Sequence, residues 1–542
     1  MRRRDLLHAF LGAPFAIAAC RGKRSRGLPA GQLVHRSETL GHRIRDHRGA
    51  LEPAADAWET SPVVVVGGGV AGLSAAWRMQ QAGAGDFVVL ELDDVLGGTA
   101  KSGQAKTGAY PWGAHYVTAP LQRNRAMVKL LGDMSVLDGV DKKGDPVIAE
   151  QYLCRDPAER VFYYGRWYEG TYLHAGASAI DRRQRSTFDK LVGKLAAKRD
   201  GKQRPAFSLP MALGSDDADI TALDRISMSE WLARHKLDSP RLRWYVDYAC
   251  RDDYGLRSEH TSAWAGLLYF ASRLTDAHAD YRPVVTWPEG NGRLVNHLAG
   301  AAGRQRMRAG WAVAELRPTA TGVDVIALTD GGKRVRGIHA SKVIFSAPHF
   351  TARYLIRDWR ASPPAHMKAL SYGSWIVANL HVTARPGGRG FPLSWDNIIY
   401  QSPALGYVVS THQTGLDHGS TVLTYYYPVL DESAAKARKL SAQLGWKEWA
   451  EIVLSDLERA HPDIRRFTTR IDIARYGHAM IQPRPGYVWG GSRAAAAAAY
   501  RNIHFAHSDL SGVALFEEAF YRGVHAAEAV MTERGRTYES LL

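Results

Sequence analysis

The sequence predicts an α/β protein in which a parallel-sheet domain carries a second domain of mixed sheet and a helical insertion. Three observations predict this fold class. A buried apolar run at 63–66 is followed by closely spaced glycines and a small-residue helix. The stretch from about 120 to 285 is helical and aromatic in pattern, and residues 350–490 mix strands with helices. A chain of 542 residues is long enough for two or three such units.

The N-terminus has the pattern of an export signal. Arg3-Arg4-Asp5-Leu6-Leu7 resembles the twin-arginine motif, and Ile17-Ala18-Ala19-Cys20 resembles a bacterial lipobox, whose cysteine is acylated. Residues 1–20 are therefore expected to be a signal, with a lipid anchor at Cys20 on the periplasmic side of a bacterial membrane. Residues 21–60 are expected to be a basic tether and N-terminal extension.

Charge and cysteine usage limit the expected partners. The net charge is +16, but residues 1–50 contain 11 Lys and Arg against 3 Asp and Glu, which is half of the excess. We therefore expect no nucleic-acid partner and favour contact with an anionic membrane surface. Beyond Cys20 only Cys154 and Cys250 remain, and the sequence leaves open whether they pair. It contains no metal-binding cysteine and histidine pattern, so no metal is expected.

A β-α-β unit opens the folded body at residue 61. A strand at Val63–Val66, a helix at Val70–Ala82 and a strand at Phe87–Glu91 have the length that this unit requires. The turn between the first strand and the helix has the GxGxxG spacing, and we expect these residues to bind phosphate: Gly67, Gly69, Val70, Ala71 and Gly72. The glycines permit a tight turn, close approach of the backbone to a pyrophosphate and close helix packing.

The acidic residue of the unit is Glu91, which ends the second strand 24 positions after Gly67. A carboxylate near this spacing accepts hydrogen bonds from ribose hydroxyls in dinucleotide-binding folds. The turn, the helix N-terminus and Glu91 together predict a dinucleotide site.

Two motifs downstream indicate which dinucleotide binds. Gly97-Gly98 follows the acidic strand end, and Trp112-Gly113-Ala114-His115-Tyr116 comes about a dozen residues later. Here the chain resembles the flavin-containing amine oxidase and phytoene desaturase superfamily, which has a Rossmann-like, discontinuous FAD domain of the GR2 type. The resemblance implies that FAD is the cofactor, that Gly97 and Gly98 wrap its diphosphate, and that Gly113, Ala114 and His115 run past the flavin ring.

The resemblance continues to the C-terminus. It implies that Val313 presents a backbone group to adenine, that Asp509 binds the ribityl chain, and that Phe516, with Leu515 immediately before it, opens the helix under the flavin. We therefore expect an FAD-binding domain in three parts, residues 61–120, 286–348 and 491–542. The helical insert is expected at residues 121–285, and the substrate domain at residues 349–490.

The family pattern is broken at three places. Thr99 stands where these oxidases carry an arginine, with Lys101 nearby as a replacement charge. No lysine follows Ala347-Pro348 before Lys368, although many amine oxidases hold one near the flavin. Leu515 stands where a tyrosine often faces the substrate.

His115 is the candidate catalytic residue, because the resemblance sets it beside the ring and imidazole titrates near neutrality. It has a second interpretation, as a histidine that orients the flavin or its neighbouring backbone. His349 is interpreted as a loop residue after a buried strand, and His478 is a candidate for the pocket.

The predicted function is that of an exported FAD-dependent oxidoreductase of the amine-oxidase type, which oxidises an amine or other small donor by hydride transfer to flavin. Two alternatives stay open. Leu515 and the missing lysine favour a desaturase or isomerase of an apolar substrate. The third hypothesis is a lipoprotein that binds FAD without catalysis.

Overall fold

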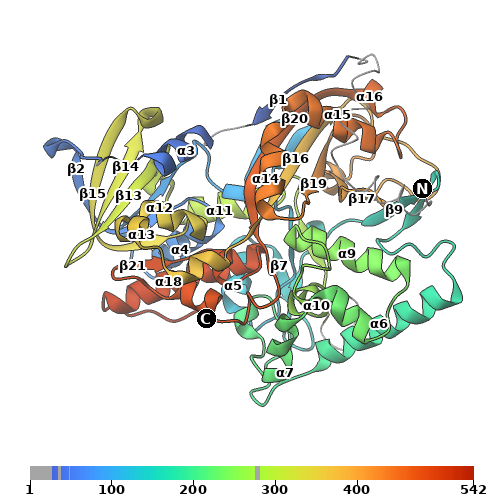
Figure 1. Cartoon of the computed structure of the whole chain (residues 1–542), viewed down its shortest axis with the longest axis horizontal. Coiled ribbons are helices and arrows are strands. Elements are labelled where there is room, and N and C mark those ends of the chain that lie inside the picture. The colour runs from blue at the N-terminus through green and yellow to red at the C-terminus, as the bar shows by residue number, and fades with distance from the viewer. Residues whose placement is uncertain (1–26, 35–37, 48, 50, 275–280) are drawn as a thin grey trace.

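The computed structural model describes residues 27–34, 38–47, 49, 51–274 and 281–542. The predicted signal and Cys20 lie outside these residues. Two sheets form the body, with a helical region below the second of them (Figure 1). Within the described part of the chain, no helix is both long and apolar enough to cross a membrane.

The first sheet is the predicted dinucleotide-binding sheet. It runs β12-β3-β2-β15-β14-β13, and β21 pairs with the C-terminal half of β15. Its strands are β2 (Trp58–Val66), β3 (Phe87–Glu91), β12 (Met307–Ala309), β13 (Ala312–Pro318), β14 (Val323–Thr329), β15 (Arg334–Phe345) and β21 (Ile503–Phe505). The β12, β3, β2, β15 and β21 strands are parallel, and β13 and β14 complete an antiparallel meander.

Small residues let the helices of this domain pack closely. Val63, Val64 and Val65 are fully buried, as a parallel strand covered on both faces requires. A Cβ at Gly523 would collide with the carbonyl of Ala71, so the last helix lies directly on the helix that follows the glycine turn. The helices around this sheet are α4 (Val70–Gln81), α5 (Arg125–Asp133), α11 (Gly292–Ala301), α12 (Ala352–Leu355), α13 (Arg357–Ala361), α17 (Ser492–Ala497) and α18 (Phe516–Glu533).

The second sheet is mixed and has the order β1-β20-β16-β19-β18-β17-β9-β10. Its strands are β1 (Ala30–Val34), β9 (Glu159–Tyr163), β10 (Arg166–Glu169), β16 (Tyr372–Val382), β17 (Asp396–Ile399), β18 (Gly406–Val409), β19 (Thr421–Val429) and β20 (Thr468–Ile481). Its helices are α14 (Ala434–Gln443), α15 (Trp446–Leu457) and α16 (Ile464–Phe467).

The region expected to be helical also contains strands. Its helices are α6 (Ala179–Ala197), α7 (Ala218–Thr221), α8 (Met228–Arg234), α9 (Pro240–Tyr254) and α10 (Ala263–Ala271). Before them, β9 and β10 extend the mixed sheet, and β7 (Leu137–Val140) pairs with β8 (Pro146–Ile148). These short strands lack the long alternating pattern from which strands are predicted. Two further ribbons pair β4 (Ser102–Ala105) with β5 (Gly108–Pro111) and β6 (Tyr116–Thr118) with β11 (Val284–Thr286).

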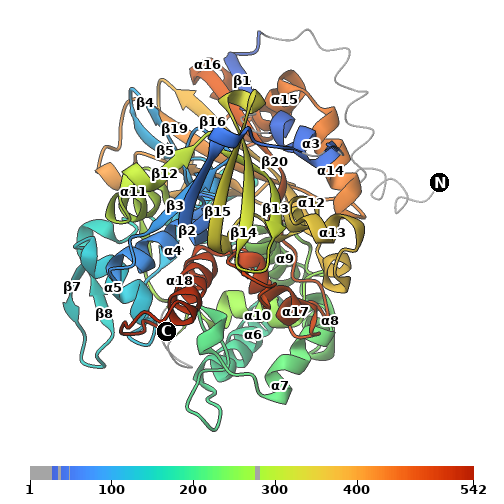
Figure 2. The same ribbon diagram turned by 90° about the vertical axis from the view of Figure 1, so that its left-hand side faces the viewer.

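The segment expected to be a tether is folded where the structure describes it. β1 adds to the edge of the mixed sheet beside β20, and α3 (Glu38–Asp46) follows. In both ribbon views α3 lies between the meander of the first sheet and α14 (Figures 1 and 2). The folded body therefore starts well before residue 61.

Both cysteines within the described residues are free thiols. Cys250 is buried in α9, and Cys154 is half-buried beside β11. Burial raises the pKa of each thiol, so neither is a reactive thiolate.

Candidate active site

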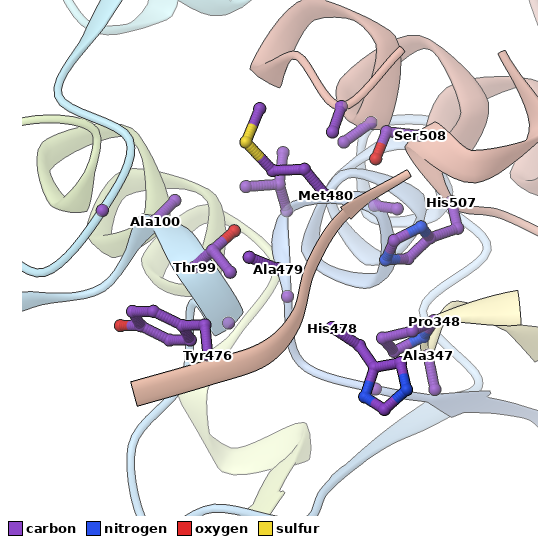
Figure 3. Close-up of a pocket in the computed structure, with 18 of the residues that line it drawn as sticks. Thr99, Ala100, Ala347, Pro348, Tyr476, His478, Ala479, Met480, His507 and Ser508 are labelled. Atoms are coloured by element: carbon purple, nitrogen blue, oxygen red, sulfur yellow. The ribbon is translucent and has the colours of Figure 1, made fainter. Parts of the chain in front are cut away.

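A cavity of about 840 Å³ lies between the two sheets. Every residue expected to bind the cofactor lines it except Gly72. Figure 3 shows part of its wall, where β20 carries Tyr476, His478 and Met480 past Thr99 and the Ala347-Pro348 turn.

The glycine turn has the shape of a dinucleotide cradle. Gly67 has a φ of +108°, which only glycine adopts readily, and its N–H donates to the carbonyl of Leu90. A Cβ at Gly72 would collide with the Gly67 carbonyl oxygen, so this glycine lets helix and strand meet behind the site. Gly69 faces Gly98 across open space, and its nearest neighbour would lie 4.0 Å from an added Cβ. The open backbone at the helix N-terminus fits a pyrophosphate.

The acidic end of β3 is organised for a ribose. Glu91 accepts hydrogen bonds from the N–H of Gly68 at 2.6 Å and of Asp93 at 2.8 Å. Burial raises the pKa of this carboxyl. The Lys101 ammonium, expected to replace the missing arginine, instead pairs with Asp93 at 2.7 Å. Its charge is thus already balanced, although its side chain lines the cavity.

Asp509 is held rigidly at the other end of the cradle. Its carboxylate accepts hydrogen bonds from the Tyr372 hydroxyl at 2.6 Å and the His349 N–H at 2.8 Å, and it lies 3.0 Å from His507. Burial opposes ionisation, but the His507 charge and these hydrogen bonds hold its pKa below the ordinary value. A carboxylate has further lone pairs, which remain for a hydroxyl of the cofactor.

Two tyrosines of the mixed sheet hold the segment that leads to His115. Tyr426 donates to the carbonyl of Gly113 at 2.8 Å, and Tyr476 donates to that of Trp112 at 2.8 Å. The Ala114 N–H donates to the Thr99 carbonyl at 3.1 Å. The two domains therefore meet at the segment that the flavin ring is expected to face.

His115 lies in an aromatic setting within this segment. Its ring stacks on Tyr426 at 4.9 Å and lies 5.3 Å from Trp395. Nδ1 is 3.2 Å from the Gly113 carbonyl, which only accepts, so Nδ1 carries the proton and Nε2 is the acceptor. Burial lowers the pKa of His115 to about 4, so the ring is neutral at physiological pH. The structure is compatible with both roles expected of His115, catalysis and orientation, because Nδ1 bonds to the backbone and Nε2 can accept a hydrogen bond from a ligand.

A carboxylate pair at the end of α9 faces the same cavity. Asp253 pairs with Arg273 at 3.2 Å, and Arg273 also donates to the Tyr116 hydroxyl at 3.2 Å. Among the residues that the structure describes, none donates a hydrogen bond to the Asp252 carboxylate. Burial, together with the charge of Asp253, raises the pKa of Asp252 to about 7.

Two more carboxylates stand behind this pair. Asp396 and Glu159 are partners in the parallel register of β17 and β9, so their side chains lie on one face of the sheet. Burial raises both pKa values, and Asp252 raises that of Asp396 further. Arg273 is the one cation that acts on Glu159 within the described residues. Four carboxyl groups therefore gather near Arg273 at this corner of the cavity, and burial raises the pKa of each.

Of the remaining candidate residues, His478 and Leu515 line the cavity and His349 lies outside it. His478 lines the cavity and stacks on Phe350 at 4.2 Å. His349 does not line it; the side chain is buried against His366, with 3.1 Å between their Nε2 atoms. Leu515 lines the cavity as the residue before α18, and its side chain offers no polar atom.

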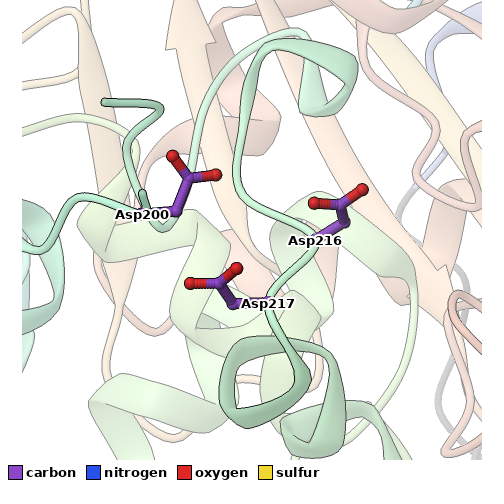
Figure 4. A group of neighbouring side chains, drawn as sticks. All are labelled: Asp200, Asp216 and Asp217. Carbon is purple, nitrogen blue, oxygen red and sulfur yellow. The ribbon is translucent and has the colours of Figure 1, made fainter. Parts of the chain in front are cut away.

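A separate acidic cluster lies on the surface of the helical region. Asp200, Asp216 and Asp217 have carboxylate oxygens within 4.8 Å of one another (Figure 4). Arg204 pairs with Asp200 at 2.7 Å and also with Asp216. Arg204 therefore links Asp200 to Asp216, and Asp200 also accepts hydrogen bonds from the backbone N–H groups of Lys202 and Arg204, so these contacts hold the loop.

Sequence reasoning missed the carboxylates of α9 and the residues that α3 contributes to the cavity. Asp252 and Asp253 end an aromatic helix just before Gly255, and this adjacent charged pair on an otherwise buried helix was the available signal. His42, Ile44 and Arg45 line the cavity from a segment that has no motif.

The chain matches known folds over nearly its whole length. Putrescine oxidase bound to putrescine has a TM-score of 0.63, with 16% identity over 88% of this chain and 100% of that chain. Cyclohexylamine oxidase from Brevibacterium oxydans IH-35A has a TM-score of 0.62, with 16% identity and the same coverage. The CLA-producing fatty acid isomerase from P. acnes has a TM-score of 0.60, with 15% identity over 87% and 98%. No curated protein sequence matches the chain.

These likenesses confirm the α/β fold with mixed sheets, and the family comparison adds the cofactor and the class of enzyme. The family model described as flavin containing amine oxidoreductase matches residues 70–531. FAD is therefore the cofactor, and the glycine cradle, Glu91 and the cavity fit it. The chain is an FAD-dependent oxidoreductase that belongs to the flavin-containing amine oxidoreductase family.

Proposed function

We propose that the protein oxidises an amine that enters the cavity with a positive charge. The observation that carries the proposal is the group of carboxylates at the α9 end of the cavity, above all Asp252. A buried carboxylate without a partner is costly, and a cationic ligand removes that cost. Putrescine oxidase and cyclohexylamine oxidase, which share the fold, are named for amine substrates.

The residues divide the work between binding and orientation. Asp252 and Asp253 bind the cationic group, and Arg273 prevents Asp253 from carrying an uncompensated charge. The neutral His115 accepts a hydrogen bond at Nε2 from the reacting amine. Bound FAD supplies the two-electron acceptor for the hydride that leaves the amine carbon. The reacting nitrogen gives up its ammonium proton to solvent before the hydride leaves, and the iminium ion that results reacts with water to give a carbonyl compound and, from a primary amine, an ammonium ion.

Mixing the purified FAD protein with substrates under anaerobic conditions tests this proposal. The panel contains monoamines, diamines, polyamines and, as an apolar arm, unsaturated fatty acids. Loss of the visible flavin absorption with an amine, and peroxide when air returns, supports amine oxidation. An absorption spectrum that no amine changes contradicts it.

The apolar alternative rests on Leu515 and on the fold shared with a fatty acid isomerase. It predicts an altered double-bond position in the fatty acid arm without net flavin reduction. The carboxyl groups favour the amine, because a cationic ligand pairs with the ionised form of Asp252, whereas an apolar ligand leaves this polar group without a partner.

We further propose export by the twin-arginine route and lipid attachment at Cys20, on the sequence motifs alone. Fractionation of cells that express the full chain tests both proposals. The native chain should appear in the membrane fraction with a lipid on Cys20, and Cys20→Ala should abolish the lipid. A cytoplasmic native chain with residues 1–20 intact contradicts export.

A further inference from the structure

The N-terminal extension is a folded part of the molecule that the family match does not cover. That match begins at residue 70, whereas β1 and α3 lie before it. β1 runs parallel to β20 with Ala30 opposite Arg470 and Val34 opposite Ala474. A Cβ at Gly31 would collide with the Ile471 carbonyl, so the strand is seated closely on the sheet.

The extension is attached to both domains. Glu38 pairs with Arg475 of β20 at 3.0 Å. Ile44 is 8% exposed and belongs to the apolar core that includes Val313 of β13. After α3, Glu52 pairs with Arg317 of β13 at 2.9 Å. β1, α3 and Glu52 together therefore contact both the mixed sheet and the dinucleotide-binding sheet.

Between these attachments α3 forms part of the cavity wall. Its lining residues are Glu38, Gly41, His42, Ile44 and Arg45. They share the cavity with Val313, where adenine is expected, and with Arg438 and His478 of the mixed sheet. Gly41 lines the cavity, and an added Cβ there would meet no atom within 4 Å, so a larger side chain fits without a clash with the protein.

The charges on this wall suit a phosphate-bearing ligand. His42 and Arg45 lie at the exposed rim, where Arg45 contacts Asp46 at 2.7 Å, and Arg438 faces them from α14. Burial, then the charges of Arg438, His42 and Arg45, lower the pKa of His478 to about 4. Arg45 is paired with Asp46 just as Lys101 is paired with Asp93, so Arg438 is the arginine on this wall that has no carboxylate partner among the described residues.

We propose that the described residues 30–34 and 38–47 form a strap across the FAD cavity, in which Ile44 covers the adenine side, His42 and Arg45 form the rim, and Arg438 supplies positive charge. The strap slows release of the dinucleotide, because FAD cannot leave on this side until α3 detaches. The proposal rests on FAD binding and is independent of the substrate.

A bulky residue at Gly41 tests the strap without disturbing protein contacts. Gly41→Trp should project into the cavity and raise the rate of FAD release by about tenfold. The melting temperature of the FAD-free protein should stay the same. Thr39→Trp on the same helix is the matched control, since Thr39 is exposed and does not line the cavity.

The release rate is measured from the rise in flavin fluorescence when the FAD protein is diluted into an excess of an FAD-trapping apoprotein. The double variant His42→Ala/Arg45→Ala and a chain that starts at Leu51 should also release FAD about tenfold faster. If the shortened chain does not fold, the point variants decide. Release at the native rate from Gly41→Trp and the double variant overturns the strap. Failure of every amine to reduce the flavin affects the proposed function alone.

Discussion

Asp252 faces the cavity without a hydrogen-bond donor among the described residues, and we propose that a cationic substrate supplies its partner. Asp252→Asn should lower kcat/KM for a cationic amine by ~10- to 100-fold, because a hydrogen bond to a charged group is worth about 1.5–3 kcal/mol. The effect should fall mainly on KM. Steady-state kinetics measures it, with the exposed Asp238→Asn as control; equal kinetics in both variants contradicts the role of Asp252.

The pKa of Asp252 predicts the pH dependence. Amine binding needs the carboxylate ionised, so kcat/KM should rise with pH through about 7 and lose this limb in Asp252→Asn. His115 cannot produce the limb, since its pKa lies near 4.

The stability of the folded protein should fall as the pH rises, whereas kcat/KM should rise. A carboxyl with a raised pKa binds its proton more tightly in the folded state, so its stabilising effect disappears as pH rises through about 7. The melting temperature of FAD-free native protein should therefore fall more than that of Asp252→Asn between about pH 5 and about pH 8. Parallel falls would exclude Asp252 as the titrating group.

Gly72 and Gly69, which follow β2, are expected to have different roles: Gly72 in helix packing and Gly69 in FAD binding. Gly72→Ala should destabilise the fold by several kcal/mol, because its Cβ meets the Gly67 carbonyl. Gly69 has φ −77° and open space, so Gly69→Ala should keep the fold and lose FAD affinity. Thermal melting and flavin titration of both variants measure this. A Gly69→Ala protein that binds FAD normally would show that the phosphates do not approach this backbone.

The elements that sequence predicted well have strong local patterns. Phe87–Glu91 is β3 as predicted, and the predicted helix from Val70 ends one residue earlier than expected. The strands β9 and β10 were missed, because four- and five-residue strands gain their stability from neighbours distant in sequence. The same reason applies to β1 and α3, whose contacts to β20 and β13 are all long-range.

The cavity is lined by both domains, so the cofactor stabilises the molecule as a unit. FAD at about 1,000 times its Kd should add about 4 kcal/mol to the free energy of unfolding. Calorimetry with and without FAD should show the transitions of both domains shifting upward together. A shift confined to one transition would mean that FAD contacts a single domain.

The cofactor motifs could be predicted because each is a short continuous stretch of sequence. Nearly all of their residues line the cavity. The substrate end could not, because Asp252, Asp396 and Glu159 come from three distant elements and meet only through the fold. His115 was found because it lies inside a cofactor motif.

The position of β21 and α18 has a consequence for protein synthesis. β21 pairs with the carboxyl half of β15, and α18 lies on α4 and supplies Phe516 to the cavity. These elements are translated last, although α4, on which α18 packs, is translated more than 400 residues earlier. We therefore expect stable FAD binding only after residues 503–533 have left the ribosome.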